Sequence, residues 1–238
     1  MIATKLKLPR TINDITLKDY QKYMKIYEAN KENDDTGFLD MKLIEIICNI
    51  DLITINKMSV DEFDYITSYL SEIFTNETPL IRRFKITGTD DVTIDFGFIP
   101  NLSKISLGEY IDLDNYLGDI QNLHKAMAVL YRPVPKQWSK KDFYNITEYE
   151  GTEKHSYIMQ EMPLGIALGA MVFFYRLGMK LSIHTMNYSM KTLEGMELSE
   201  EQNQLLQKSM DGIKACMPSL EEMLYSLTKL PTYKSTKP

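Results

Sequence analysis

The first third of the chain spaces its apolar residues three and four positions apart, as one face of an α-helix requires. This spacing predicts helices over residues 17–30 and 39–49, separated by a polar loop. A third helix starts after Ser59, because Ser59 and Glu62 match a capping box, and it ends before Pro79. The apolar positions that define these helices are Leu17, Tyr20, Met24, Tyr27, Met41, Ile44, Ile47, Phe63, Ile66, Leu70 and Phe74.

After Arg83 the period changes to two, which is typical of a β-strand. The alternating apolar residues are Phe84, Ile86, Val92, Ile94, Phe96 and Phe98. Residues 87–91 lie between the two runs and are turn-forming, so the pattern predicts a β-hairpin. An isolated hairpin is marginally stable in water. It therefore either packs on the helices or pairs its edge with another chain.

The second half of the chain returns to the helical period. Ser106 and Glu109 form another capping box, which predicts a helix over residues 107–116. A second helix is predicted over residues 119–131, ended by Pro133. The mixed polar and aromatic residues that follow, 138–157, are typical of a long ordered loop.

A long helix is predicted over residues 164–190, with Pro163 in its first turn. Its first half is apolar nearly all round, which indicates a buried central helix. Its glycines, Gly165, Gly169 and Gly178, each weaken a helix, and the expected compensation is close packing against neighbours. The apolar run Ile166–Leu177 is too short to span a bilayer, so no membrane contact is expected.

Two further helices are predicted before the C-terminus, over residues 199–216 and 218–227. The resulting fold class is mainly α, a multi-helix globular domain with one small β-hairpin. Residues 14–80 form a helical subdomain, and residues 81–227 form the hairpin plus helical core, continuous with the preceding helices. Residues 1–13 and 228–238 are basic and lack apolar periodicity, which predicts an N-terminal and a C-terminal arm.

Charge and cysteine usage narrow the functional classes. The net charge of −6 argues against direct binding of nucleic acid. Cys48 and Cys216 are isolated, so neither a disulfide framework nor a paired-cysteine metal site is expected. The chain holds 15 Met and 15 Tyr, which suits either adaptable interfaces or a Met-filled helical core. The N-terminal residues lack the apolar stretch of a secretory signal, which favours synthesis in the cytoplasm.

Residues that could support catalysis or metal binding are sparse. The histidines, His124, His155 and His184, have no second ligand at metal-site spacing. Asp112 and Asp114 lack the loop that a calcium site needs and are better explained as helix surface. No cofactor, metal or catalytic residue is therefore expected. An enzymatic alternative, a hydrolase, would use the carboxylates Glu148, Glu150 and Glu153.

Tyr131, Arg132 and Pro133 are candidate interface residues, because Tyr and Arg are frequent hot spots at protein interfaces. The alternative is structural, with the arginine capping the carbonyl end of a helix and the tyrosine packing on proline. The C-terminal arm adds a second candidate set, Lys229, Tyr233 and Lys234.

Several segments together resemble a group of tailed-bacteriophage structural and assembly proteins, from phages of Bacteroidetes hosts that include crAss-like phages. The segments, in chain order, are an LPR-x-I-x-DITL opening at 8–17, FGFIPNLSKISLGEYIDLD at 96–114, HKAMAVLYRPV at 124–134, EYEGTE at 148–153 and MPLGIALGAMVFFYRL at 162–177. The resemblance covers residues 5–180 and rests on segment order, without a catalytic motif.

The resemblance implies a product of the head–tail morphogenesis genes, made in the host bacterial cytoplasm. The expected function is a non-enzymatic virion structural protein near the portal vertex or tail, present in many copies in a symmetric assembly. Its partners would be portal, tail or capsid subunits. The alternative is a tail-assembly chaperone that is absent from the mature virion.

Overall fold

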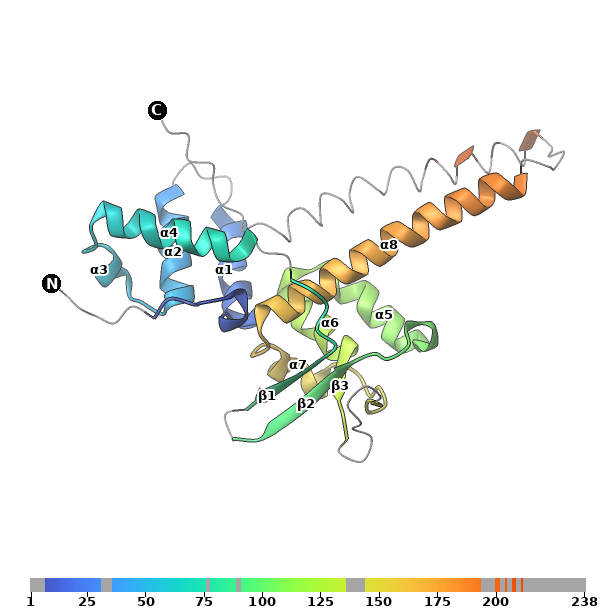
Figure 1. Cartoon of the computed structure of the whole chain (residues 1–238), viewed down its shortest axis with the longest axis horizontal. Helices are drawn as coiled ribbons and strands as arrows, with labels where there is room; N and C mark the ends of the chain where they lie inside the picture. Colours follow the sequence, from blue (N-terminus) through green and yellow to red (C-terminus); the bar gives the residue numbers. More distant parts are fainter. Residues whose placement is uncertain are drawn as a thin grey trace.

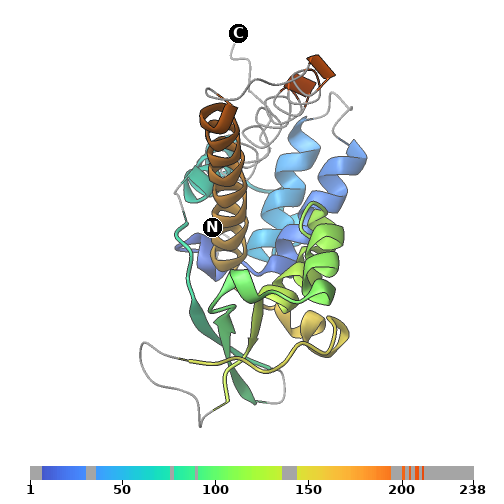
Figure 2. The same ribbon diagram turned by 90° about the vertical axis from the view of Figure 1, so that its right-hand side faces the viewer.

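A computed structural model describes residues 7–30, 36–75, 78–88, 91–135 and 144–193, with residues 200, 201, 204, 207, 208 and 211 beyond them. Helices dominate the described chain, and one small antiparallel sheet lies at its lower edge in Figures 1 and 2. The predicted fold class is therefore confirmed. Buried apolar side chains from Ile12 to Tyr175 form one hydrophobic cluster.

The N-terminal part of the described chain is helical. Its elements are η1 (Ile12–Asp14), α1 (Leu17–Asn30), α2 (Thr36–Cys48), α3 (Leu52–Ile55) and α4 (Val60–Thr75). The Ser59–Glu62 capping box is present, since Glu62 N donates to Ser59 Oγ at 3.2 Å and Ser59 N donates to Glu62 Oε2 at 3.1 Å. The short helix α3, capped by Asp51, was not predicted because a single turn carries no period.

The described part of the predicted N-terminal arm packs on the body, which corrects the expectation of an arm for residues 7–13. Pro9 and Ile12 are buried, and the Tyr69 hydroxyl donates to the Pro9 carbonyl at 3.1 Å. Thr16 then forms a β-bridge with Pro163, so the chain start is tied to the segment that leads into α8.

The remaining described elements form the sheet and the helices beside it. They are β1 (Arg83–Thr87), β2 (Thr93–Phe98), η2 (Leu102–Lys104), α5 (Leu107–Tyr116), η3 (Ile120–Asn122), α6 (Leu123–Leu130), β3 (Tyr131–Pro133), α7 (Glu153–Met159) and α8 (Leu164–Leu193). The predicted helix over residues 119–131 is thus a 3₁₀ turn followed by a short α-helix. The helix α7 begins within residues 138–157, the segment predicted to be a loop, and ends two residues beyond it.

The hairpin gains a third strand, and this corrects the prediction for Tyr131 and Arg132. Strand order is β1-β2-β3, and Phe98 of β2 pairs with Tyr131 of β3. Tyr131 has extended dihedral angles, φ −118° and ψ 118°, so α6 ends at Leu130. Pro133 forces the preceding residue toward extended backbone and suits an edge strand. The third strand supports a hairpin that would be marginal alone.

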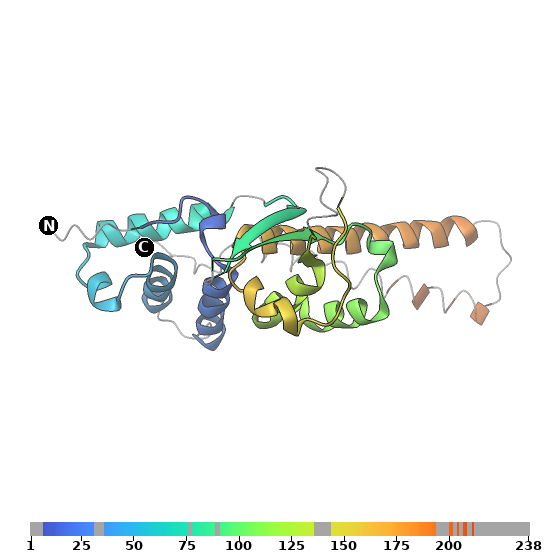
Figure 3. The same ribbon diagram turned by 90° about the horizontal axis from the view of Figure 1, so that it is seen from below.

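Helix α8 is the central element, as predicted, and its first half is buried between the N-terminal helices and the sheet (Figure 1). Phe173 and Phe174 lie against Phe98 of the sheet, with ring centroids 5.7 and 6.1 Å away. The distal half of α8 extends beyond α5 (Figure 3). Two residues of this distal half, Leu181 and Tyr188, are exposed.

The glycines of α8 differ in their surroundings. A methyl group on Gly169 would lie 2.5 Å from the Pro79 carbonyl oxygen, and one on Gly165 would collide with Asn13 and Ile12. Around Gly178 no atom of the described residues lies within 4 Å of such a group. Close packing is therefore confirmed for Gly165 and Gly169, and no described residue packs closely at Gly178.

Replacing Gly169 by alanine should destabilise the protein by about 1–3 kcal/mol, because the contacted atoms are backbone and cannot move independently. The matched change Gly178→Ala in the same helix should stabilise it by up to about 1 kcal/mol, since alanine favours helix and has room there. Urea denaturation followed by circular dichroism measures both. Equal effects of the two substitutions would contradict the close packing at Gly169.

Candidate functional site

One cavity of about 230 Å³ lies where β3, α6, α7 and the segment before α7 meet. Its lining residues are Ala128, Arg132, Pro133, Thr147, Glu148, Tyr149, Glu150, Gly151, Lys154 and His155. The structure therefore brings two separate sequence candidates together. Arg132 and Pro133 line the same cavity as Glu148 and Glu150, and the two pairs lie at least 15 residues apart in the sequence.

The base of this site is a buried ion pair. Arg132 Nη2 donates to Glu109 Oε1 at 2.6 Å, and only 10% and 6% of the two side chains are exposed. The other oxygen of Glu109 accepts the Ser106 backbone N–H at 2.6 Å in the capping box of α5. One carboxylate, that of Glu109, thus caps the N-terminus of α5 and also neutralises Arg132 of β3.

Tyr149 covers this ion pair from the loop side. Its ring lies over the Arg132 guanidinium, whose Cζ atom is 5.8 Å from the ring centroid. Its hydroxyl donates to the carboxylate of Asp112 on α5. Burial, together with this hydrogen bond to an acid, raises the pKa of Tyr149 well above its ordinary value. The hydroxyl is therefore a fixed donor rather than a proton carrier.

The charge of Arg132 is costly where it lies. Burial lowers the pKa of Arg132 from its ordinary value, while the nearby Glu109 opposes that shift. Its Nε atom is buried and has no hydrogen-bond partner among the described residues. An arginine buried with one unsatisfied donor depends strongly on its single carboxylate partner.

The mouth of the cavity carries a second, exposed ion pair and a histidine. Lys154 Nζ donates to Glu150 Oε2 at 2.9 Å, and this hydrogen bond lowers the pKa of Glu150. His155 packs edge-on against Phe96, with ring centroids 6.0 Å apart. Burial first, and then the neighbouring Lys154, lower the pKa of His155, so its imidazole is neutral at pH 7.

These groups suit binding of a small polar group better than hydrolysis. Glu150 is held ionised by Lys154, so it is a poor general acid for a glycosidase-type reaction. Among the described residues, burial raises the pKa of one carboxyl group, Asp40 on α2, with Asp64 adding to the shift. Asp40 does not line this cavity. Glu153 is exposed at the start of α7 and lies outside the lining as well.

Metal chemistry finds no support in the described part of the chain, where no group of three or more His, Cys, Asp and Glu side chains could hold an ion. The three histidines lie on different elements. His124 Nδ1 is 3.1 Å from Gln21 Nε2 at the contact between α1 and α6. Asp112 is engaged by Tyr149.

The predicted interface residues differ in how far they are buried. The side chain of Tyr131 is fully buried and its hydroxyl donates to the Ile81 carbonyl at 2.8 Å. Arg132 is buried in the ion pair, so the expectation that Tyr131 and Arg132 lie on an exposed interface is wrong. Pro133 is half-buried beside the cavity. Lys229, Tyr233 and Lys234 lie outside the described residues.

Other residues present exposed apolar surface. On α5, Leu107, Tyr110 and Ile111 are 74%, 59% and 47% exposed and share one face at helical spacing. On the distal half of α8, Leu181 and Tyr188 are 59% and 73% exposed. Exposed apolar groups clustered on one face mark interaction surfaces. The sequence predicted the helix over residues 107–116, but it gave no sign that this face is left uncovered.

Helix α8 also meets a simple criterion of length and composition for a membrane span, which the apolar run Ile166–Leu177 alone does not meet. Within the described residues, Leu164–Tyr188 is long and apolar enough to cross a bilayer, with a mean hydropathy of 1.5. The central helix of a soluble protein meets the same criterion, and 44% of the tested window is buried inside this chain. The criterion is therefore weak evidence for a membrane span.

Comparison of the chain with protein-family models, with curated proteins and with solved structures found no match in any of the three.

Replacing Glu109 by glutamine should lower the free energy of unfolding by about 3–5 kcal/mol, because the buried Arg132 loses its compensating charge. Glutamine can keep the capping hydrogen bond, so the loss reports on the ion pair. The control is Glu161→Gln, which removes an exposed pair with Lys18 at 3.4 Å and should cost at most about 1 kcal/mol. Similar losses in urea denaturation for both variants would contradict a dominant buried pair.

Acidification should destabilise the protein below pH 6.5, the ordinary pKa of histidine. Burial lowers the pKa of both His124 and His155, so below pH 6.5 the unfolded chain binds more protons than the folded one. Stability is lost as the pH falls from 6.5 toward the folded-state pKa values. Urea denaturation at pH 7.5, 6.5 and 5.5 should show this slope, and the double variant H124Q/H155Q should flatten it.

The matched control for this pH dependence is His184→Gln, because His184 is exposed on α8. That variant should keep the wild-type slope. A slope unchanged in H124Q/H155Q would assign the acid sensitivity to other groups.

Proposed function

We propose that this chain is a non-enzymatic structural subunit of a tailed-bacteriophage particle, docking in many copies near the portal vertex or tail. The observation that carries the proposal is the distal half of α8, which extends beyond α5 (Figure 3). In this half, Leu181 and Tyr188 are 59% and 73% exposed. Contact of apolar side chains with water is unfavourable, so a partner that covers those on a projecting helix lowers the free energy.

A second apolar face supports repeated contacts. Leu107, Tyr110 and Ile111 on α5 form a stripe on the same side of that helix. A subunit in a ring needs two different surfaces, one for each neighbour. The stripe on α5 and the distal half of α8 are two such surfaces on different elements. The resemblance of residues 5–180 to phage assembly proteins gives the assembly its proposed identity.

The second candidate is a tail-assembly chaperone absent from the mature virion, which the same exposed apolar faces favour. A chaperone uses such a surface transiently to cover an apolar region of a client. The two roles differ in whether the chain stays in the finished particle.

The test is quantitative mass spectrometry of purified particles from the phage that carries the gene, with the portal protein as the internal reference. A structural subunit should be present in copy numbers comparable with the portal. Presence in the infected-cell lysate together with loss from purified particles would replace the structural role by the chaperone role. A gene that lies in no phage genome would overturn both.

A paired substitution links the result to the surface. The variant L181D/Y188S should fold normally and be incorporated at least about tenfold less, because both side chains are exposed and an interface aromatic contributes on the order of 2 kcal/mol. The control is Tyr65→Ser on α4, a tyrosine that is 65% exposed on a different helix. Equal incorporation of both variants would remove α8 from the interface.

A further inference from the structure

One edge of the sheet has no strand paired to it among the described residues. The β3 side is covered, because the Thr147 backbone N–H donates to the Pro133 carbonyl at 3.0 Å. Strand β1 forms the opposite edge (Figure 1), and β2 is the described strand that pairs with it. The hairpin therefore keeps an edge to which a further strand can be added.

The hydrogen bonds of the hairpin determine which backbone groups of β1 point away from β2. Phe98 N donates to the Arg82 carbonyl at 2.8 Å, and bonded positions alternate with non-bonded ones along an antiparallel pair. Phe84 and Ile86 therefore bond to β2, whereas the N–H and C=O groups of Lys85 point outward. These outward groups have no backbone partner within the described part of the chain.

A strand added at this edge would also cover a half-buried aromatic ring. On the inner face of the sheet, the Phe84 ring contacts Phe96 and Tyr131, with ring centroids 5.9 and 5.0 Å away. The neighbouring inner residue Ile86 is buried, but Phe84 is only half-buried. Alternate residues of an added strand share this face, so apolar side chains there would remove more of the ring from water.

The outer face of β1 is cationic. Lys85 is exposed and lies opposite Asp95 of β2. The two Asp95 oxygens already accept hydrogen bonds from Arg83, at 3.0 and 2.7 Å. Arg82, just before the strand, is also exposed. An acidic side chain on a neighbouring strand would complement the charge of Lys85, because opposite charges side by side on a sheet face attract.

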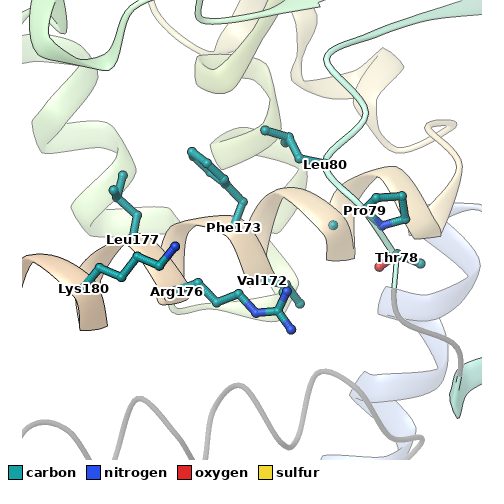
Figure 4. A pocket seen from close by; sticks show the side chains of 9 residues that line it. Thr78, Pro79, Leu80, Val172, Phe173, Arg176, Leu177 and Lys180 are labelled. Carbon is teal, nitrogen blue, oxygen red and sulfur yellow. The ribbon is translucent and has the colours of Figure 1, made fainter.

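The start of this edge is fixed against the body. A cavity of about 200 Å³ lies between α8 and the segment before β1. Figure 4 shows Pro79 and Leu80 of this segment beside Val172 and Phe173 of α8. The Pro79 backbone also approaches α8 closely at Gly169. The edge is therefore held in place before a partner arrives, which lowers the entropic cost of binding.

A second copy of β1 fits this edge poorly. Antiparallel pairing of two copies centred on Lys85 would place the two lysines directly opposite each other, and like charges at that position are destabilising. Lysine on an edge strand is one of the means by which proteins prevent self-association. The same residue therefore disfavours a second copy and favours an acidic strand.

We propose that the β1 edge binds an extended segment of another protein, with alternating apolar and acidic residues, as an additional antiparallel strand of the sheet. Its apolar side chains cover Phe84 on the inner face, and its acidic side chains lie beside Lys85 on the outer face. This binding uses neither α5 nor the distal half of α8, so it does not depend on a role in a phage particle.

The probe is a fluorescein-labelled peptide of sequence VEVEVEV, titrated with the full chain and followed by fluorescence anisotropy. In antiparallel addition a glutamate lies opposite Lys85 and donates its N–H toward β1, whereas the valine N–H groups point away. N-methylation of the glutamates should therefore abolish binding, and N-methylation of the valines should preserve it. The peptide VKVKVKV should bind at least about tenfold more weakly.

Two substitutions test the same edge from the protein side. Lys85→Pro removes the outward N–H but no hydrogen bond to β2, so the chain should fold and bind the peptide at least about tenfold more weakly. Lys85→Glu should weaken binding by about fivefold or more. The matched control is Lys57→Glu, an exposed lysine before α4, which should leave binding unchanged.

Amide hydrogen exchange tests whether the edge is open before peptide is added. In the free chain the Lys85 amide should exchange faster than those of Phe84 and Ile86, and bound peptide should slow it. Slow exchange of the Lys85 amide in the free chain, equal binding of the two N-methylated peptides, or no binding at millimolar VEVEVEV would overturn the proposal. A dimer of the free chain that Lys85→Pro converts to monomers would assign the edge to a second copy instead.

Discussion

The first half of α8 is the constraint on which the rest of the structure depends. Three parts of the described chain that are distant in sequence touch it: the turn at Ile12 and Asn13, the Pro79 backbone, and the aromatic face of the sheet through Phe98. Two of these contacts depend on glycines of α8: at Gly169 the backbone of Pro79 approaches the helix, and at Gly165 the side chains of Ile12 and Asn13 do. A helix that is apolar nearly all round has no alternative to being covered on every side, so the other elements are arranged around it.

The pair formed by Arg132 and Glu109 plays the corresponding role at the sheet. The third strand completes the hairpin, but it carries an arginine into the interior, where an unpaired charge would be prohibitive. The carboxylate comes from the first turn of α5, already oriented by its capping box. One residue therefore serves a local requirement of a helix and a long-range requirement of a strand. The cavity beside Tyr149 and His155 forms over this pair.

Local sequence signals predicted most of the helices, whereas features that depend on contacts between distant residues were missed. The boxes at Ser59 and Ser106 each lie within four consecutive residues, so the sequence alone located those helix starts. Strand β3 is three residues long and is a strand because it pairs with β2. Three residues are too few to show a strand period in the sequence, so the pattern could not predict it. The position of Arg132 at the end of an apolar run indicated a buried ion pair, because a buried arginine requires a partner. Glu109 was recognised as a cap, but its second bond depends on tertiary structure.

The two halves of α8 differ in their surroundings. The first half carries Leu168, Ala170 and Met171, which are buried, so packing within the chain explains its apolar character. Further along the same helix, Leu181 is exposed. Exposed apolar surface on a helix that extends beyond α5 is suited to contact a partner.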